Sequence, residues 1–180
     1  MIRPLILASA SPQRRAILEE AGFAFEVRPA NVDELTEGDP REVALENARR
    51  KALAIPGDLV LGADTDVALD GEILGKPRDA AHARELIGRL NGRTHEVVGG
   101  IALARSGVIV DWAVEITWVT FRESDAATLD EYVATGEWEG RAGGYAIQGE
   151  GSRLVDHIDG DYLNVVGLPL ERLKVLLATH

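Results

Sequence analysis

The chain has 180 residues, 46% of them hydrophobic, with a formal net charge of −11 at pH 7 and no cysteine. This length suits one domain with one core, residues 1–180, and the negative charge argues against binding to nucleic-acid polymers or membranes. The lack of cysteine excludes disulfides, thiolate metal sites and cysteine nucleophiles. No apolar run approaches the length of a membrane span or a signal-peptide core, so we expect a soluble, cytoplasmic protein.

The first predicted elements are a short strand at residues 5–7 and a helix that Ser11 caps and a proline opens. The strand runs almost directly into the helix, so free backbone N–H groups and the positive end of the helix dipole point at one spot. Ser9 adds a hydroxyl group there, and Arg14 and Arg15 add guanidinium groups. The pattern favours a phosphate, although it is also typical of an ordinary capped helix with a solvated face.

The rest of the chain alternates between helix and strand signals. In chain order we predict a helix over 12–21, a strand over 23–27, a helix over 39–55, a strand over 59–65, a hairpin of 67–69 with 72–74, a helix over 79–90, a long hairpin over 95–121, a helix over 125–135, a strand pair of 153–158 with 162–166, and a helix from Pro169. This order predicts an α/β fold in which helices flank a mixed β-sheet.

Several acids and lysines occupy positions that suit chemistry. Asp64 follows an apolar strand, and Asp33 and Glu34 lie in an acidic loop. Lys51 falls at the edge of the apolar stripe of its helix, where a lysine either extends past the core or reaches into a cleft. Lys76 lies on a turn after a hairpin. Carboxylates with lysine or arginine are the groups of magnesium-dependent phosphate chemistry, but spacing alone does not bring these residues together.

A glycine-rich segment covers residues 140–151. Such a segment is either a flexible surface loop or backbone that must pass close to a ligand.

Eight short motifs lie in order along nearly the whole chain. They are residues 7–12 followed by Arg14, 32–34, 51–52, 62–65, 75–77, 90–92 with His95, 142–149 and 165–169. Together they resemble the Maf family of nucleoside triphosphate pyrophosphatases. The resemblance implies a mixed, bent β-sheet flanked by helices with a central cleft, as in Maf and inosine triphosphatase-like proteins.

The resemblance also implies an activity. A nucleoside triphosphate would be hydrolysed to the monophosphate and pyrophosphate with a divalent metal ion, Mg²⁺ or Mn²⁺. Family members often pair as homodimers, and some are described as inhibitors of septum formation in bacterial cell division.

Site residues follow from the resemblance position by position. Asp64 would be the proton acceptor and, with Glu34, would hold the metal. The remaining contacts would come from Ser9, Arg14, Lys51 and Lys76 on the triphosphate, and from Gln13, Thr65 and Gln148 on the nucleotide. Whether Asp64 is a general base or a metal ligand stays open, because a free carboxylate with a pKa of about 3.9 is a weak base at neutral pH.

Three of these residues bear on the preferred base. Thr65 and Gln148 match the subgroup that acts on dTTP and UTP, whereas Gln13 stands where that subgroup usually has arginine and the 7-methyl-GTP subgroup has tryptophan. The amide of Gln148 offers a donor and an acceptor side by side, which complements uracil and thymine. We therefore expect dTTP and UTP as substrates. Asp66 departs from the family in another way, because an apolar residue is usual at its position.

Two alternatives remain at this stage. Asp64 to Val67 after an apolar strand also resembles the nucleophile motif of haloacid-dehalogenase-type phosphatases, although a hairpin follows where that fold needs a helical crossover. The other alternative is a non-catalytic nucleotide-binding regulator of cell division. Release of pyrophosphate, release of orthophosphate, or binding without turnover would separate the three hypotheses.

Overall fold

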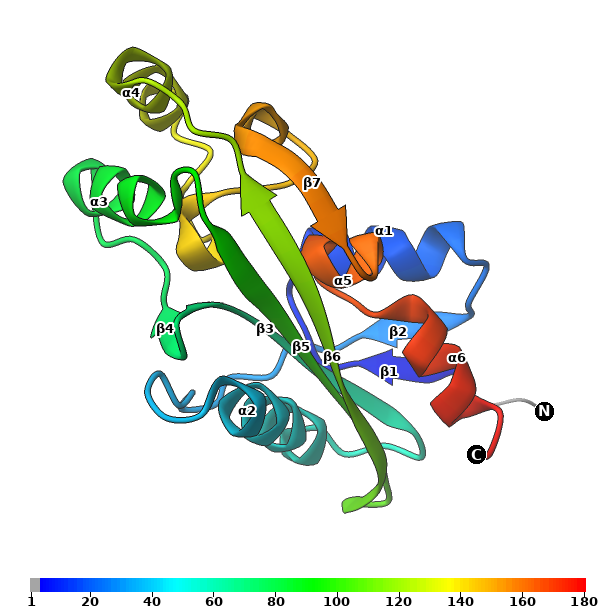
Figure 1. Ribbon diagram of the computed structural model, residues 1–180. Coiled ribbons are helices and arrows are strands. Elements are labelled where there is room, and N and C mark those ends of the chain that lie inside the picture. The colour runs from blue at the N-terminus through cyan, green and yellow to red at the C-terminus, as the bar shows by residue number, and fades with distance from the viewer. Residues whose placement is uncertain (1–3) are drawn as a thin grey trace.

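The computed structural model describes residues 4–180, which form one seven-stranded sheet with helices against it (Figure 1). The strands are β1 (Leu5–Leu7), β2 (Phe25–Val27), β3 (Val60–Leu69), β4 (Glu72–Leu74), β5 (Thr94–Arg105), β6 (Val108–Phe121) and β7 (Val155–Asp159). The helices are α1 (Pro12–Glu20), α2 (Pro40–Ala54), α3 (Ala80–Leu90), α4 (Ala126–Ala134), α5 (Tyr162–Val166) and α6 (Leu170–Leu177), with the 3-10 helices η1 (Ala142–Gly144) and η2 (Glu150–Leu154).

The sheet is mixed, as predicted. Its strand order is β2-β1-β3-β5-β6-β7, and β4 pairs with the far half of β3. Strand β1 runs parallel to β2 and β3, while the other pairs are antiparallel. The predicted turn between β3 and β4 is confirmed, because Asp70 and Gly71 both have positive φ angles (51° and 81°), as a two-residue hairpin turn requires.

Helices cover both faces of the sheet at the β1 end (Figure 1). Leu5 and Leu7 share a core cluster with residues of α1 and α6, whereas Ile6 packs with Ala48 and Ala52 of α2. Neighbouring residues of β1 therefore point to opposite faces, and both faces are buried. This two-sided burial explains why β1 has a continuous apolar sequence.

A separate core cluster occupies the other end of the long β5–β6 hairpin. There α3, α4 and η1 gather around the strand ends, away from α2 and α6 (Figure 1). Leu86 of α3, Phe121 of β6 and Tyr132 of α4 belong to this cluster. The sheet thus supports two groups of helices. None of the helices formed by residues 4–180 combines the length and hydrophobicity needed to cross a membrane.

The predicted strand over 162–166 is wrong, because these residues form α5. A carboxylate oxygen of Asp161 accepts the backbone N–H groups of Leu163 and Asn164 (2.8 and 3.3 Å), which caps the helix. The buried Asn164 amide then donates to the Val97 carbonyl (3.2 Å) and the Thr117 hydroxyl (3.1 Å). The cap and these tertiary bonds outweigh the strand propensity of the segment's apolar residues.

Candidate active site

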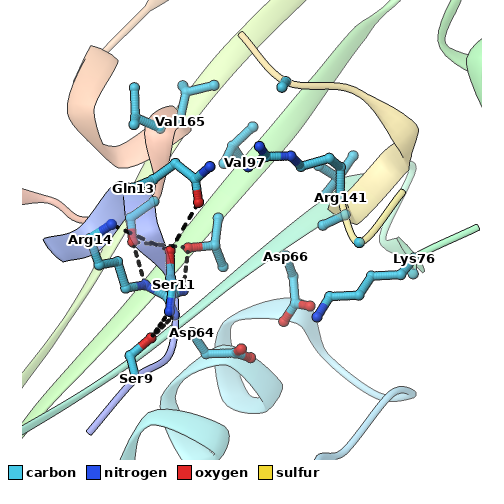
Figure 2. Close-up of a pocket in the computed structure, with 18 of the residues that line it drawn as sticks. Ser9, Ser11, Gln13, Arg14, Asp64, Asp66, Lys76, Val97, Arg141 and Val165 are labelled. Carbon is cyan, nitrogen blue, oxygen red and sulfur yellow. Dashed lines mark hydrogen bonds between the residues drawn. The ribbon is translucent and has the colours of Figure 1, made fainter. Parts of the chain in front are cut away.

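A cavity of about 1080 Å³ opens between the β1–α1 junction, the end of β3, the turn before α3, the η1–η2 segment and α5 (Figure 2). Its lining includes every residue that the resemblance assigned to the site: Ser9, Gln13, Arg14, Glu34, Lys51, Asp64, Thr65, Lys76 and Gln148. Asp33, which the sequence placed beside Glu34, is exposed and does not line this cavity. The predicted central cleft therefore exists, and it collects residues from across the chain.

Arg14 is fixed in the cleft wall by neutral acceptors. Its guanidinium donates to the Ser9 hydroxyl (3.0 Å), the Thr65 hydroxyl (3.1 Å) and the Gly167 carbonyl (2.8 Å). Burial lowers the pKa of Arg14, against the opposing charge of Asp64 and more distant acids. Within residues 4–180 no carboxylate lies close enough to pair with it, so this positive charge at a helix N-terminus is well placed for a phosphate.

The neighbouring arginine points elsewhere. Arg15 forms an i,i+4 ion pair with Glu19 (2.7 Å), and both side chains are largely exposed. The prediction that Arg15 contributes to the phosphate site is therefore wrong. Arg14 lies three and four residues before the buried Ile17 and Leu18, so it belongs to the inward face of α1.

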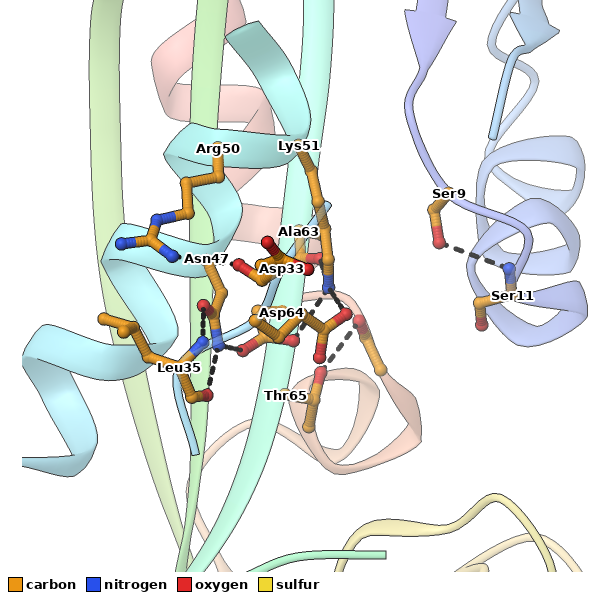
Figure 3. Close-up of polar contacts among 12 residues, drawn as sticks. Ser9, Ser11, Asp33, Leu35, Asn47, Arg50, Lys51, Ala63, Asp64 and Thr65 are labelled. Atoms are coloured by element: carbon orange, nitrogen blue, oxygen red, sulfur yellow. Dashed lines mark hydrogen bonds and ion pairs between the residues drawn. The ribbon is translucent and has the colours of Figure 1, made fainter. Parts of the chain in front are cut away.

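Lys51 reaches into the cleft and meets two acids there (Figure 3). Its ammonium lies 2.9 Å from Asp64 Oδ1, 3.0 Å from Glu34 Oε1 and 3.2 Å from the Ala63 carbonyl. Only 8% of Lys51 and 7% of Asp64 is exposed. Of the two orientations that the sequence allowed for Lys51, the structure shows the one directed into the cleft. The pair places a largely buried carboxylate and a cation side by side.

Asp66 adds a further acid on the same face of β3 as Asp64, two residues along the strand. Its Oδ2 atom is buried and has no hydrogen-bond partner among residues 4–180. Burial, followed by the charges of Asp64 and Glu34, raises the pKa of Asp66 to about 7. Glu34, Asp64 and Asp66 thus place three carboxyl groups around the single ammonium group of Lys51, which pairs with the first two.

The carboxylates in this part of the cleft suit a Mg²⁺ ion that is coordinated partly by the protein and partly by a bound phosphate ligand. Mg²⁺ prefers oxygen ligands, and it is usually bound by one or two carboxylates together with phosphates and water. Glu34 and Asp64 offer such oxygens, and the unpartnered Asp66 oxygen shows that this part of the cleft can accept more positive charge. Among residues 4–180, no three acidic, histidine or cysteine side chains form a complete protein cage for a metal.

The opposite wall carries two more cations (Figure 2). Lys76 is exposed on the turn before α3, and Arg141 extends from the start of η1 over the cleft. In the described part of the chain, neither side chain forms an ion pair. Both are therefore available to a polyanionic ligand. Arg141 was not among the residues predicted for the site, although an arginine inside a glycine-rich segment is a signal that could have indicated it.

The glycine-rich segment is held at two points. The Glu137 carboxylate accepts the backbone N–H groups of Glu150 and of the glycine after it (2.8 and 3.1 Å). The Tyr145 hydroxyl lies 2.6 Å from Nε2 of the buried His95. Gln148 lies between these anchors and lines the cleft. Of the two readings of this segment, the structure supports backbone that passes close to a ligand site.

These features define an α/β protein whose mixed sheet carries a cation-lined cleft. A solved structure of a HAM1 protein from Coxiella burnetii has the same fold, with a TM-score of 0.57 and 16% sequence identity over 99% of this chain and 100% of that chain. The model of the Maf-like protein family matches residues 4–180, and the chain belongs to this family. The predicted family and fold class are confirmed.

Relatives that are named dTTP/UTP pyrophosphatases are similar over nearly their whole length. The dTTP/UTP pyrophosphatase of Anaeromyxobacter dehalogenans is 49% identical over 179 residues, which cover 96% of this chain and 92% of that protein. The dTTP/UTP pyrophosphatase of Pyrococcus furiosus is 48% identical over 175 residues, covering 94% of this chain and 91% of that protein. The phosphatase and non-catalytic alternatives gain no support from these relatives.

Proposed function

We propose that this protein hydrolyses nucleoside triphosphates, with dTTP and UTP preferred, to the monophosphate and pyrophosphate. The single observation that carries the proposal is the Lys51–Asp64 pair, which shares one cleft with the unneutralised Arg14. Cations for a triphosphate and an acid for the attacking water thus lie within one cavity. The names of the relatives support the same activity.

In the proposed reaction, water attacks the α-phosphorus and the bond from that phosphorus to the α,β-bridging oxygen breaks. Asp64 accepts the proton of the water, while Arg14, Lys51 and Lys76 neutralise phosphate oxygens as negative charge moves onto pyrophosphate. Glu34 and Asp64 would also hold a Mg²⁺ or Mn²⁺ ion, which supplies further charge neutralisation when bound. The resemblance implied that Ser9 contacts the triphosphate, but in this scheme Ser9 is a positioning residue, because its hydroxyl accepts from Arg14.

Base recognition is assigned to Gln148 and Gln13. The resemblance also implied a nucleotide contact for Thr65, but its hydroxyl accepts from Arg14 (3.1 Å) and donates to the Gly167 carbonyl (3.3 Å), so Thr65 positions Arg14 as Ser9 does. The Gln13 side chain is held by the N-cap, because the Ser11 hydroxyl donates to Gln13 Oε1 (3.2 Å). This bond leaves the Gln13 NH₂ group for the nucleotide. Gln148 is exposed to the cleft and offers both a donor and an acceptor.

The test is a panel of dTTP, UTP, CTP, GTP and 7-methyl-GTP with Mg²⁺, with pyrophosphate and orthophosphate measured separately. We expect pyrophosphate from dTTP and UTP at a kcat/KM about a hundredfold above that for 7-methyl-GTP, because a lost pair of buried hydrogen bonds costs a few kcal/mol. Asp64→Asn should abolish turnover while nucleotide still binds, and Gln148→Glu should reduce the preference. Orthophosphate as the first product, or a fully active Asp64→Asn variant, would contradict the proposal.

We also propose that two copies of the chain form a homodimer. Strand β7 covers β6 only from Trp118 to Phe121, so the 108–117 half of β6 has β5 as its one described strand neighbour. Trp112 and Val108 are exposed along this edge (49% and 64%). Free edges of this kind pair readily with another strand. Sedimentation equilibrium measures the mass, and a monomer at all concentrations would refute the pairing.

A further inference from the structure

Helix α2 lies unusually close to the sheet because two strand positions carry no side chain. A Cβ atom on Gly62 of β3 would lie 2.0 Å from the Ala48 carbonyl oxygen, and one on Gly100 of β5 would lie 2.4 Å from the Ala44 carbonyl oxygen. Only glycine permits this approach. As a result, the inner face of α2 between these contacts reaches the acid on β3.

Asn47 lies on that inner face, one turn before Lys51, and only 1% of it is exposed. Its Nδ2 group donates to Asp64 Oδ2 (2.9 Å) and to the Leu35 carbonyl (3.0 Å), and its Oδ1 atom accepts the Leu35 backbone N–H (2.8 Å) (Figure 3). The orientation of the amide is unambiguous, because a backbone N–H can only donate to the oxygen. The NH₂ group must therefore face Asp64.

Asn47 and Lys51, one turn apart on α2, each bind one oxygen of the Asp64 carboxylate. Lys51 holds Oδ1 and Asn47 holds Oδ2, so rotation about the last side-chain bond of Asp64 would break one contact or both. That rotation is otherwise soft, since terminal bonds to planar groups have broad minima. Asn47 and Lys51 together fix the plane of the acid.

The side-chain amide of Asn47 also binds the acidic loop that contains Asp33 and Glu34. Asn47 binds both backbone groups of Leu35, the residue that follows Glu34. A second contact holds this loop from outside, where the Arg50 guanidinium donates to the Asp33 carbonyl (2.9 Å) at an exposed position. The two hydrogen bonds between Asn47 and the backbone of Leu35 are better shielded from water than the contact between Arg50 and Asp33. They link the residue after Glu34 to the same amide that binds Asp64.

We infer that Asn47 is a positioning residue that holds Asp64 and the Glu34 loop in the reactive arrangement. This inference rests on the proposed function. Misplacing a reacting group by about 1 Å can cost about a hundredfold in rate. Loss of Asn47 should therefore lower kcat and leave KM almost unchanged, because the cations that hold the triphosphate stay in place.

Two variants and one matched control test this role. Asn47→Leu keeps a similar size and removes every polar contact, while Asn47→Asp keeps the shape and the acceptor for Leu35 but loses the donors. The control is Asn91→Leu. Asn91 lies outside the cleft, and its amide makes the same two hydrogen bonds to another backbone: it donates to the Ser124 carbonyl (3.1 Å) and accepts the Ser124 N–H (2.9 Å). The measurements are kcat and KM for dTTP, and amide hydrogen exchange at Leu35.

We expect both Asn47 variants to lower kcat about 10- to 100-fold with KM within about threefold, following the cost of misplacement. Exchange at the Leu35 amide should accelerate in Asn47→Leu and stay slow in Asn47→Asp. Asn91→Leu should lose stability and keep its kcat.

The possible outcomes separate this inference from the proposed function. A folded Asn47→Leu variant with wild-type kcat overturns the positioning role, and so does an equal loss of kcat in Asn91→Leu. Should Asn47→Leu fail to fold, the isosteric Asn47→Asp variant decides in the same way. Wild-type protein that releases no pyrophosphate from any triphosphate overturns the proposed function instead.

Discussion

Replacing Asp66 by asparagine should stabilise the nucleotide-free, metal-free protein at high pH. The pKa of Asp66 is about 7 in the folded protein against a value of 3.8 without the fold, because the carboxylate is buried near Asp64 and Glu34. Between these two values the folded state binds more protons than the unfolded state. The stability of the wild type therefore falls as pH rises from 4 to 7, and the loss is complete near pH 8.

The size of the effect follows from the same numbers. A pKa raised from 3.8 to about 7 corresponds to about 4 kcal/mol, at ~1.4 kcal/mol for each factor of ten. Asp66 is partly exposed, and water and neighbouring charges reduce the penalty, so we expect about 2 kcal/mol. For a chain of this length, that gain raises the melting temperature by about 4 to 8 °C.

The assay is urea denaturation of the wild type and Asp66→Asn at pH 5 and pH 8 in EDTA. The advantage of the variant should be larger at pH 8 than at pH 5, and comparing the two pH values removes any constant effect of the new amide. Asp66→Val, which restores an apolar residue, should show the same pH dependence. An advantage that is equal at both pH values would refute the reasoning.

Three further changes probe the cleft. Lys51→Met leaves two carboxylates without their cation, so it should lower both the stability, by about 3 kcal/mol, and the turnover. Lys76→Met should keep the wild-type melting temperature and lower kcat/KM at least about tenfold, because Lys76 is exposed and lines the cleft in which we propose that substrate binds. Unchanged kinetics would show that Lys76 does not reach the phosphates. Gly62→Ala forces a Cβ atom to 2.0 Å from the Ala48 carbonyl and should cost at least about 3 kcal/mol. Gly75→Ala should be nearly neutral in urea denaturation, because beyond its chain neighbours no atom of residues 4–180 lies within 4 Å of the new Cβ. Equal stability of the two glycine variants would contradict the close packing of α2.

Local signals were sufficient for the parts of the site that single elements create. The Ser11 cap and the following proline specify where α1 starts, and the cap is observed, since the Ser11 hydroxyl accepts the Arg14 N–H (3.3 Å). The position of Asp64 followed from the apolar strand before it. The resemblance to Maf proteins then supplied the set of residues that line the cleft.

Long-range packing decided what the sequence left open or got wrong. From the sequence, Asn47 looks like an ordinary polar residue of a helix. Its contact with Asp64 depends on how closely α2 approaches Gly62. The sequence could have indicated this role, because Asn47 lies four residues before Lys51 and therefore on the same face of the helix, beside the alanine stripe. The helix α5 was missed because its buried Asn164 finds partners on β5 and β6, far away in the sequence.

The bond from Arg14 to the Gly167 carbonyl joins residues 153 positions apart (2.8 Å). Arg14 in one wall of the cleft is thus synthesised 153 residues before the carbonyl group that supports it. A chain emerging from the ribosome therefore carries Glu34, Lys51, Asp64 and Lys76 well before the Arg14 side chain is held in place by Gly167. Because such distant contacts form late in folding, we expect ligand-binding competence to appear only with the final native packing, so that chains not yet extended to Gly167 do not bind the ligand.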